Sequence, residues 1–238
     1  MLKDAPDMLE IGAHQVPFKV RRNRRAKRMY LRYHPADHTF SLTLPQRTRI
    51  EEGVRFVSSK SDWIAQTLQH TPMRKTYRPG MLLPILGQMT RLVSDPDLPA
   101  PFALRDDTLM IGAGSGSFAK RTEAALKKIV RHELSELADF KAQQLNKTVN
   151  RITLRDTRSR WGSCSSARNL MFSWRLVFAP YEVLDYVVSH EVAHLRHMNH
   201  SARFWLCVES ICPDYLAWKD WLRDHGSELY CFASDKQG

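Results

Sequence analysis

The sequence predicts an α+β protein whose N-terminal half is rich in short strands and whose C-terminal half is mainly helical. Apolar residues alternate with polar ones between Gln15 and Pro45, which is the period of half-buried strands. From Phe118 onward, apolar residues recur at helical spacing instead. The stretch 112–117, GAGSGS, separates the two patterns. We therefore expect two domains, a smaller β-rich and basic domain over residues 1–117 and a second domain over residues 118–238.

The composition fits a folded protein and argues against several classes. The chain has 238 residues, 43% of them apolar, which is enough for a substantial core. No stretch approaches the roughly 18 apolar residues that a membrane-spanning helix needs, and the charged N-terminus does not resemble a secretory signal. The four cysteines form no C-x-x-C pair, which favours free thiols. These features predict a cytoplasmic protein with no membrane partner.

Several short strands are expected in the N-terminal half. Alternating apolar residues predict strands near Val16–Val20, Tyr30–Tyr33 and Phe40–Leu44, and the turns between them favour an antiparallel meander. The segment Arg49–His70 changes to helical spacing. Short apolar runs within Leu82–Ile111, bounded by glycine, proline and aspartate, predict further strands of the same half.

Basic residues concentrate in the N-terminal part of the chain. The first 80 residues contain 16 Lys and Arg against 7 Asp and Glu, a net charge of +9 out of +11 for the whole chain. In Arg21–Arg28, RRNRRAKR, six of eight residues are basic. Such a segment can bind nucleic acid through its phosphates, or it can be a solvated hairpin tip. No stacking-aromatic or helix-turn-helix pattern adjoins it, which favours the hairpin tip and leaves nucleic acid as an alternative partner.

The C-terminal half is expected to contain four main helices. Helical spacing predicts a long amphipathic helix over Phe118–Leu145. Pro180 suits the first turn of the next helix, where its missing N–H is no loss. Ser201 is a plausible N-cap for a third helix, and a fourth follows Pro213 and ends at Gly226.

A metal-binding motif lies in Val187–His200, which reads VVSHEVAHLRHMNH. His190, Glu191 and His194 form the pattern H-E-x-x-H. Residues four apart share one helix face, so the two imidazoles can bind one metal ion. Glu191 lies next to them and can reach a metal-bound water without being a ligand. Zinc hydrolases use this arrangement.

Zinc requires a third protein ligand, for which His197 and His200 are the candidates. On a continuing helix, His197 would lie about 10 Å along the axis from His190, at ~1.5 Å per residue. That distance is too long for one ion bound at ~2.1 Å from each nitrogen. If the helix ends near Asn199, the chain can turn back and bring His200 to the metal. We therefore predict one zinc ion per chain on His190, His194 and His200, with His197 beside the ligands or on the substrate side.

A small, polar segment precedes the motif helix. Its residues are Arg160, Trp161, Gly162, Ser163 and Cys164, reading RWGSC. The glycine allows another backbone to approach closely, and a strand beside the metal can pair with an extended peptide. An ordinary hairpin turn is the alternative interpretation. The pattern alone does not distinguish between a strand that lines the substrate site and a hairpin turn.

Two segments together resemble a known family. RWGSC and the run Tyr181–Trp205, YEVLDYVVSHEVAHLRHMNHSARFW, are similar to the YgjP-like zinc metallopeptidases, which are grouped with the WLM and SprT-like zincin proteases. The basic hairpin and the K-x-x-W-I pattern at Lys60–Ile64 are similar to that family too. The spacing H-E-x-x-H-x5-H is also like that of the WLM proteases, which act on proteins crosslinked to DNA.

The resemblance implies a zincin-like α+β catalytic domain behind the β-rich domain. It implies zinc on the three predicted histidines, Glu191 as general base, and the RWGSC segment as the edge strand that lines the substrate site. The predicted function is therefore a zinc-dependent metallopeptidase, a hydrolase that cleaves protein or peptide substrates with a metal-activated water. Two alternatives follow from the basic segment: a nucleic-acid-associated protein whose zinc site is structural, and a protease recruited to DNA-bound proteins.

Overall fold

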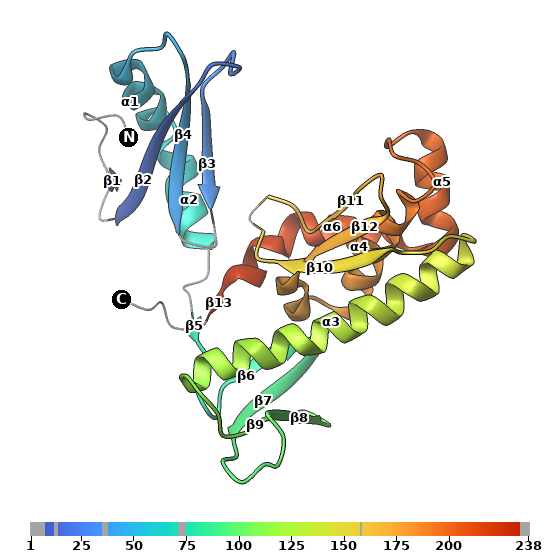
Figure 1. The fold of residues 1–238 in the computed structure, drawn as a ribbon. Helices are drawn as coiled ribbons and strands as arrows, with labels where there is room; N and C mark the ends of the chain where they lie inside the picture. The colour runs from blue at the N-terminus through green and yellow to red at the C-terminus, as the bar shows by residue number, and fades with distance from the viewer. Residues whose placement is uncertain (1–7, 12–13, 35–37, 71–74, 158, 234–238) are drawn as a thin grey trace. The chain divides into compact units, whose positions relative to one another are not determined.

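The computed structural model describes residues 8–11, 14–34, 38–70, 75–157 and 159–233 (Figure 1). Its contacts divide the chain into two compact units, unit 1 (Met1–Met73) and unit 2 (Arg74–Gly238). Both units combine helices with small sheets, so the protein is α+β as predicted. In the part of the chain that the structure describes, no helix has the length and apolar character needed to span a membrane.

Unit 1 is a four-stranded sheet followed by two helices. The strands have the order β1-β2-β4-β3, and α1 and α2 pack on the apolar face of the sheet. The elements are β1 (Met8–Ile11), β2 (His14–Asn23), β3 (Tyr30–His34), β4 (Thr39–Pro45), α1 (Ile50–Ser58) and α2 (Ser61–His70). The core consists of the alternating apolar residues of β2 and β4 with Val57 and Ile64 from the helices.

The predicted antiparallel meander is wrong in one pairing. β3 and β4 are antiparallel, but β2 and β4 are parallel, because β4 inserts between β2 and β3. The alternation of apolar residues determines which side chains face the core, but it does not determine which strands are neighbours. The helical segment that follows is also divided, since α1 ends at Ser58 and α2 begins at Ser61.

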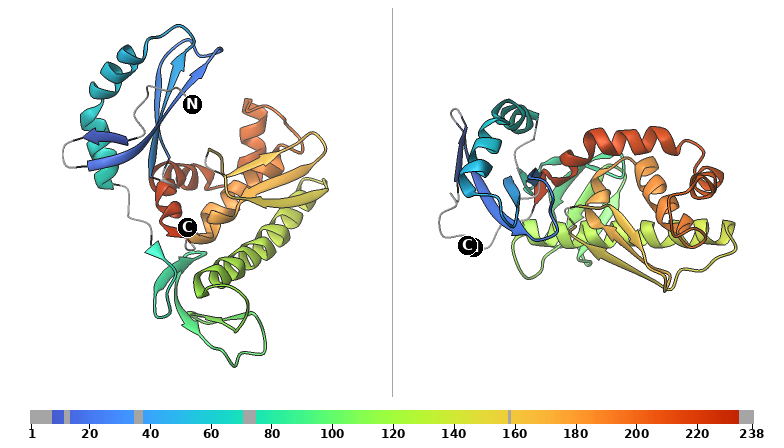
Figure 2. Two further views of the ribbon diagram at one scale, coloured as in Figure 1. Left: turned by 60° about the vertical axis from the view of Figure 1, so that its left-hand side comes forward. Right: turned by 90° about the horizontal axis from the view of Figure 1, so that it is seen from above.

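Unit 2 is organised around one long helix, α3 (Phe118–Gln144), as predicted (Figures 1 and 2). Two sheets, with strand orders β6-β7-β9-β8 and β10-β12-β11, and three further α-helices share a core with it. The elements before α3 are β5 (Lys75–Thr76), β6 (Leu82–Ile85), β7 (Gln88–Ser94), β8 (Phe102–Arg105) and β9 (Thr108–Ile111). Those after it are β10 (Arg151–Arg155), β11 (Gly162–Cys164), β12 (Asn169–Ser173), η1 (Trp174–Phe178), α4 (Tyr181–Ala193), α5 (Ala202–Ile211), α6 (Tyr215–His225), η2 (Gly226–Tyr230) and β13 (Phe232–Ala233).

The division between the two units differs from the expected boundary at residues 117 and 118. The glycine-rich stretch 112–117 is an ordered turn inside unit 2, between β9 and α3. Arg121 of α3 donates hydrogen bonds to the carbonyl oxygens of Gly112, Gly114 and Gly116. Because the β6–β9 sheet also shares its core with α3, it belongs to the same unit as the C-terminal helices.

Candidate functional site

Helix α4 presents the H-E-x-x-H residues from a deeply buried position. Pro180 precedes the helix, and the apolar residues of the first turns are almost fully buried: Val183, Leu184, Val187 and Val188. The helix ends at Ala193, with His194 at its C-cap, earlier than the end expected near Asn199. The chain therefore leaves the helix directly after the second histidine of the motif.

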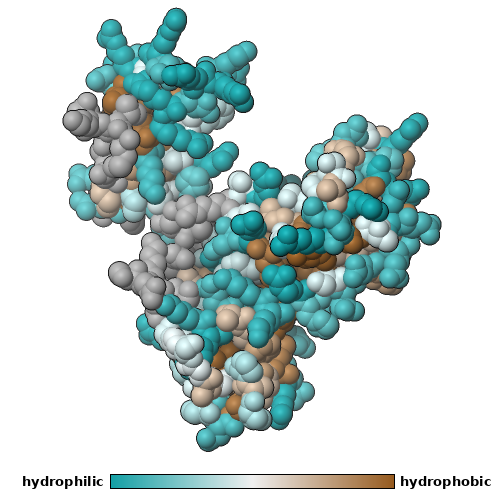
Figure 3. Space-filling model, viewed as in Figure 1, coloured by the Kyte–Doolittle hydropathy of each residue, from teal (hydrophilic) through white to brown (hydrophobic). Residues whose placement is uncertain are grey.

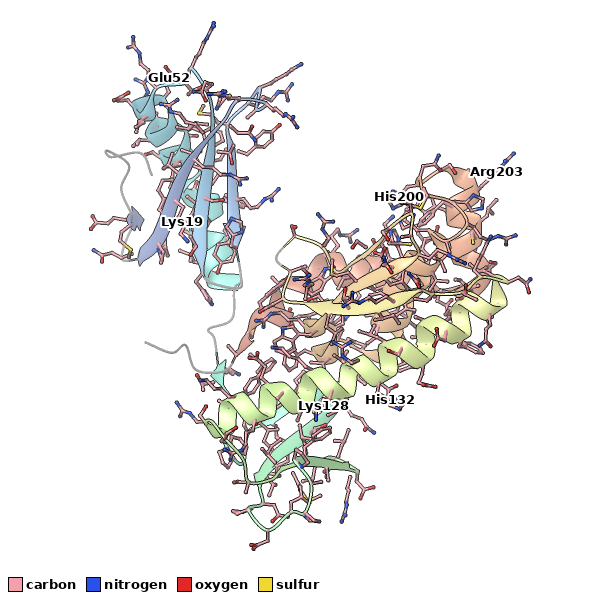
Figure 4. The ribbon with its side chains drawn as sticks, viewed as in Figure 1. Lys19, Glu52, Lys128, His132, His200 and Arg203 are labelled. Atoms are coloured by element: carbon pink, nitrogen blue, oxygen red, sulfur yellow. The ribbon has the colours of Figure 1, made fainter. Side chains whose placement is uncertain are left out.

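The imidazoles of His190, His194 and His200 meet at one point. Their ligand nitrogens all lie within 4.8 Å of one another. Nε2 of His190 lies 3.1 Å from Nε2 of His200, and the ring centroids of His194 and His200 are 4.8 Å apart. His200 reaches the group from the turn ahead of α5 (Figure 4). The structure thus brings together the three histidines that the sequence predicted.

Phe204 of α5 holds the three rings together from one side. It is fully buried, and its ring centroid lies 5.0 Å from that of His190, 4.5 Å from that of His194 and 4.7 Å from that of His200. Because α5 begins at Ala202, directly after the turn that carries His200, Phe204 lies in the first turn of α5. The sequence analysis did not single out Phe204, and its spacing of four residues from His200 is the signal that could have identified it.

The surroundings of His190 and His194 favour neutral imidazoles. Burial, together with the neighbouring histidines and Lys219, lowers the pKa of His190 to about 4. Burial also lowers the pKa of His194. The neutral imidazole is the form that binds a metal. Two Nε2 atoms that face each other at 3.1 Å can share at most one proton, whereas a cation between the rings satisfies both, so this donor set fits zinc.

His197 lies beside the group and is not part of it. Its carbonyl oxygen accepts a hydrogen bond from Nδ1 of His194 at a distance of 2.9 Å. This contact sets the tautomer and orientation of the His194 ring, so that Nε2 stays free to bind a metal. The predicted place of His197, next to the ligands, agrees with this geometry, but the contact is made by the backbone.

Glu191 is a buried carboxylate next to the three rings, with 6% of its surface exposed. Burial raises its pKa to about 8, and the positive charge of Arg160 partly opposes this shift. A bound dication would lower the pKa again, because it favours the charged form. A buried carboxylate in a cavity, close to a set of metal-binding nitrogens, is typical of a catalytic group.

Strand β11 passes directly beside Glu191, and Gly162 makes this approach feasible. A Cβ atom at position 162 would lie 2.6 Å from Oε1 and 2.8 Å from Cδ of Glu191, closer than real contacts allow. β11 pairs with β12 in antiparallel register. Among the described strands, only β12 pairs with β11, so β11 is an edge strand of its sheet.

Two adjoining cavities connect the histidines with the RWGSC segment. The larger has a volume of about 430 Å³ and contains the three histidines, Glu191 and Met198 together with Ser159, Arg160, Gly162, Ser163 and Cys164. The smaller, of about 220 Å³, adds Trp161, Tyr186, Val187 and Leu222. All five residues predicted to line the substrate site therefore border these cavities. The sequence analysis missed Tyr186, although it precedes His190 by one helical turn.

Comparison with known proteins finds one matching family model and two solved structures with partial similarity. The family model of the YgjP-like metallopeptidase domain matches residues 27–225. The metallopeptidase zymogen of Pyrococcus abyssi abylysin is 20% identical over 39% of this chain and 92% of its own, with a TM-score of 0.35. The metallopeptidase zymogen of Methanocaldococcus jannaschii jannalysin is 21% identical over 39% of this chain and 90% of its own, with a TM-score of 0.27. No curated protein matches the chain.

Proposed function

The chain belongs to the YgjP-like metallopeptidase family, and on that premise we propose that it is a zinc-dependent metallopeptidase with a zincin-like catalytic unit. The proposal depends above all on one observation. Three imidazoles that are within 4.8 Å of one another lie in the same cavity as a buried carboxylate. This combination of nitrogen donors and one adjacent general base is what hydrolysis of a peptide bond at a metal requires.

His190, His194 and His200 would hold one zinc ion per chain. When bound, zinc acidifies a water molecule towards neutral pH and polarises the carbonyl of the scissile bond. Three nitrogen donors suit a catalytic site, because a tetrahedral ion then keeps one position for water or substrate. The carbonyl of His197 and the ring of Phe204 keep the donors oriented.

Glu191 is the proposed general base and acid. Its carboxylate accepts a proton from the attacking water and then delivers this proton to the leaving amine. Because the group is buried, its charge is screened by little solvent. Gly162 provides the space that the carboxylate occupies beside β11, because a Cβ atom at this position would clash with it.

The substrate is proposed to bind along β11 as an additional strand. Backbone hydrogen bonds to the open edge would align an extended peptide, whatever its side chains are. The cavity walls formed by Arg160, Trp161, Ser163 and Cys164 would then contact the side chains on either side of the scissile bond. The scissile bond would then lie in the cavity that Glu191 and the three histidines line.

Metal removal tests the proposal. We expect the purified protein to contain about one zinc ion per chain and to cleave an unfolded protein such as reduced casein. A chelator should abolish cleavage, and added zinc should restore it. Cleavage by the metal-free protein would contradict the proposal.

Substitution of Gly162 by alanine is expected to lower kcat/KM by about 100-fold, because the new methyl group displaces the Glu191 carboxylate. Zinc content should be unchanged, because the three atoms nearest to the added methyl group all belong to Glu191. Ser166→Ala is the matched control, because Ser166 is exposed at the tip of the same hairpin. Equal activity of the two variants would show that the close approach of β11 is unimportant for catalysis.

The alternative is a nucleic-acid-associated protein in which the metal only supports the fold. It predicts that metal removal unfolds unit 2, and that no condition reveals cleavage of an unfolded substrate. A thermal unfolding scan of the metal-free protein, made beside the cleavage assay, distinguishes the two functions.

A further inference from the structure

The sheet of unit 1 has one apolar face and one basic face. Phe18, Phe40 and Leu42 point into the core beneath α1 and α2. Because side chains alternate along a strand, the residues between them point outward. The register of the strands aligns these outward residues in two rows, which are Arg21, Thr43 and Tyr30, and Lys19, Ser41 and Arg32.

A hollow of about 450 Å³ lies on this basic face. It is lined by the turn after β2, by all three residues of the first row and by Arg32 of the second row. We call it the basic hollow and define it by the cations and the two other side chains that matter here: Arg21, Arg25, Lys27, Arg32, Tyr30 and Thr43. Most of the surface of unit 1 visible in Figure 3 is hydrophilic.

The positive charge of the basic hollow is not balanced by neighbouring acids. Among the described side chains of the sheet, the only carboxylate is Glu10, which accepts a hydrogen bond from Gln15 at 2.8 Å. Glu10 pairs with β2 at Gln15, which lies six residues from Arg21 along the strand, or about 20 Å at ~3.3 Å per residue. Within the described part of the chain, the four cations make no ion pair with a carboxylate, and Arg21 donates to the hydroxyl of Thr43 at 2.9 Å. An unbalanced cluster of this kind attracts a polyanion.

Arg22 shows how an arginine with a structural role differs from these cations. It alternates with Arg21 and points to the other face, where it donates to the carbonyl oxygens of Pro45, Gln46 and Thr48. Its guanidinium therefore fixes the chain after β4. The cations of the basic hollow have no such backbone partners among the described residues, and their side chains are exposed.

Tyr30 adds an aromatic surface to the basic hollow. Its side chain is 58% exposed at the first position of β3, beside Thr43 and in the same row as Arg21. The sequence analysis found no stacking aromatic next to the basic segment. The structure supplies one, because β4 lies between β2 and β3 and brings Tyr30 to the floor of the hollow. An exposed ring among cations is the arrangement that binds an unpaired base.

We propose that the basic hollow binds single-stranded nucleic acid, with its cations on the phosphates and Tyr30 stacked on a base. The cations supply affinity for any phosphate backbone. The ring favours a single strand, because the bases of a duplex are already stacked on one another and cannot cover it. The site is independent of the proposed peptidase activity, since all of its residues belong to unit 1.

Fluorescence anisotropy of the full-length protein with a short labelled oligothymidine tests the proposal. We expect binding whose log K falls with log salt at a slope of about −3, from four phosphates at ~0.7 each. Tyr30→Ala should weaken binding of the single strand about tenfold or more, and Tyr30→Trp should retain it. Neither substitution should change binding of a duplex of the same length, because the duplex uses only the cations.

A pair of double variants provides the matched control. Arg25→Ala with Lys27→Ala should weaken binding and reduce the salt slope by about 1.4, at ~0.7 per phosphate contact. Arg55→Ala with Lys60→Ala removes the same charge from exposed positions at α1 and should change the salt slope little. No binding at low salt, or equal losses in the two double variants, would overturn the proposal. An unchanged single-strand affinity in Tyr30→Ala would overturn it as well. The surface would then bind any polyanion through its charge alone, and anionic vesicles would bind equally.

Discussion

Replacement of Glu191 by glutamine is expected to lower kcat/KM for peptide cleavage by about 10²–10⁴-fold while zinc remains bound. Glutamine has nearly the same size and fits the space beside Gly162, but it cannot accept a proton from water. The measurement combines a cleavage assay with metal analysis of the same preparation. Undiminished cleavage would exclude Glu191 as general base, and loss of the metal would indicate that Glu191 is itself a ligand.

The stability of the same variant provides a control for misfolding. The substitution is expected to stabilise the metal-free protein, whereas misfolding would destabilise it. Burial raises the pKa of Glu191 from 4.5 to about 8, so the folded protein holds this proton more tightly than the unfolded chain does. The free energy of unfolding of the metal-free protein therefore falls as pH rises from about 4.5 to about 8. Because the glutamine side chain does not ionise, this fall in the free energy of unfolding is absent in Glu191→Gln. Metal-free Glu191→Gln should thus unfold at a higher temperature than the wild type at pH 8, and the difference should vanish at low pH. The inactive, metal-loaded variant can then also serve to retain bound substrates for identification.

The second large effect is expected for His200→Ala, which should lose most of the bound zinc and the activity with it. His200 supplies the one donor from outside α4, and its removal leaves only the two donors of the H-E-x-x-H motif. The loss of zinc affinity should exceed the roughly 10–100-fold typical of residues that only orient a ligand. Competition with a chromophoric chelator measures it.

His197→Ala is the matched control for this substitution. It also removes an imidazole from the turn after α4, but the carbonyl that accepts the hydrogen bond from His194 stays in place. Zinc binding should therefore be nearly normal. If His200→Ala kept its zinc while His197→Ala lost it, the assignment of the third ligand would have to be reversed.

The group of three histidines was predictable because it depends on the local geometry of one helix and the turn after it. Four residues make one helical turn, so His190 and His194 share a face, and a third donor had to come from a position where the chain turns back. Phe204, Tyr186 and the carbonyl of His197 were not predictable in the same way. Their contribution depends on how α5 and the turn after α4 pack, which no residue spacing specifies.

The fold was predictable to the level of elements and less so in their pairing. The helix Phe118–Gln144 and the short strands follow from apolar periodicity. The parallel pairing of β2 with β4 does not, because it requires β3 to lie at the edge of the sheet and leave the position beside β2 to β4. Composition also misplaced the boundary between the units. The stretch 112–117 has the residues of a linker, yet the hydrogen bonds from Arg121 make it part of the packed unit.

The two units have separate apolar cores, one centred on Phe40 and Leu42 and the other on residues such as Trp174 and Val188. A chain with two cores has two cooperative elements, and nothing requires them to melt together. A single midpoint of denaturation then describes both units only if the calorimetric and spectroscopic transitions coincide. All donors of the proposed metal site belong to unit 2, so bound zinc would raise the melting temperature of that unit by mass action and leave the other as an internal reference.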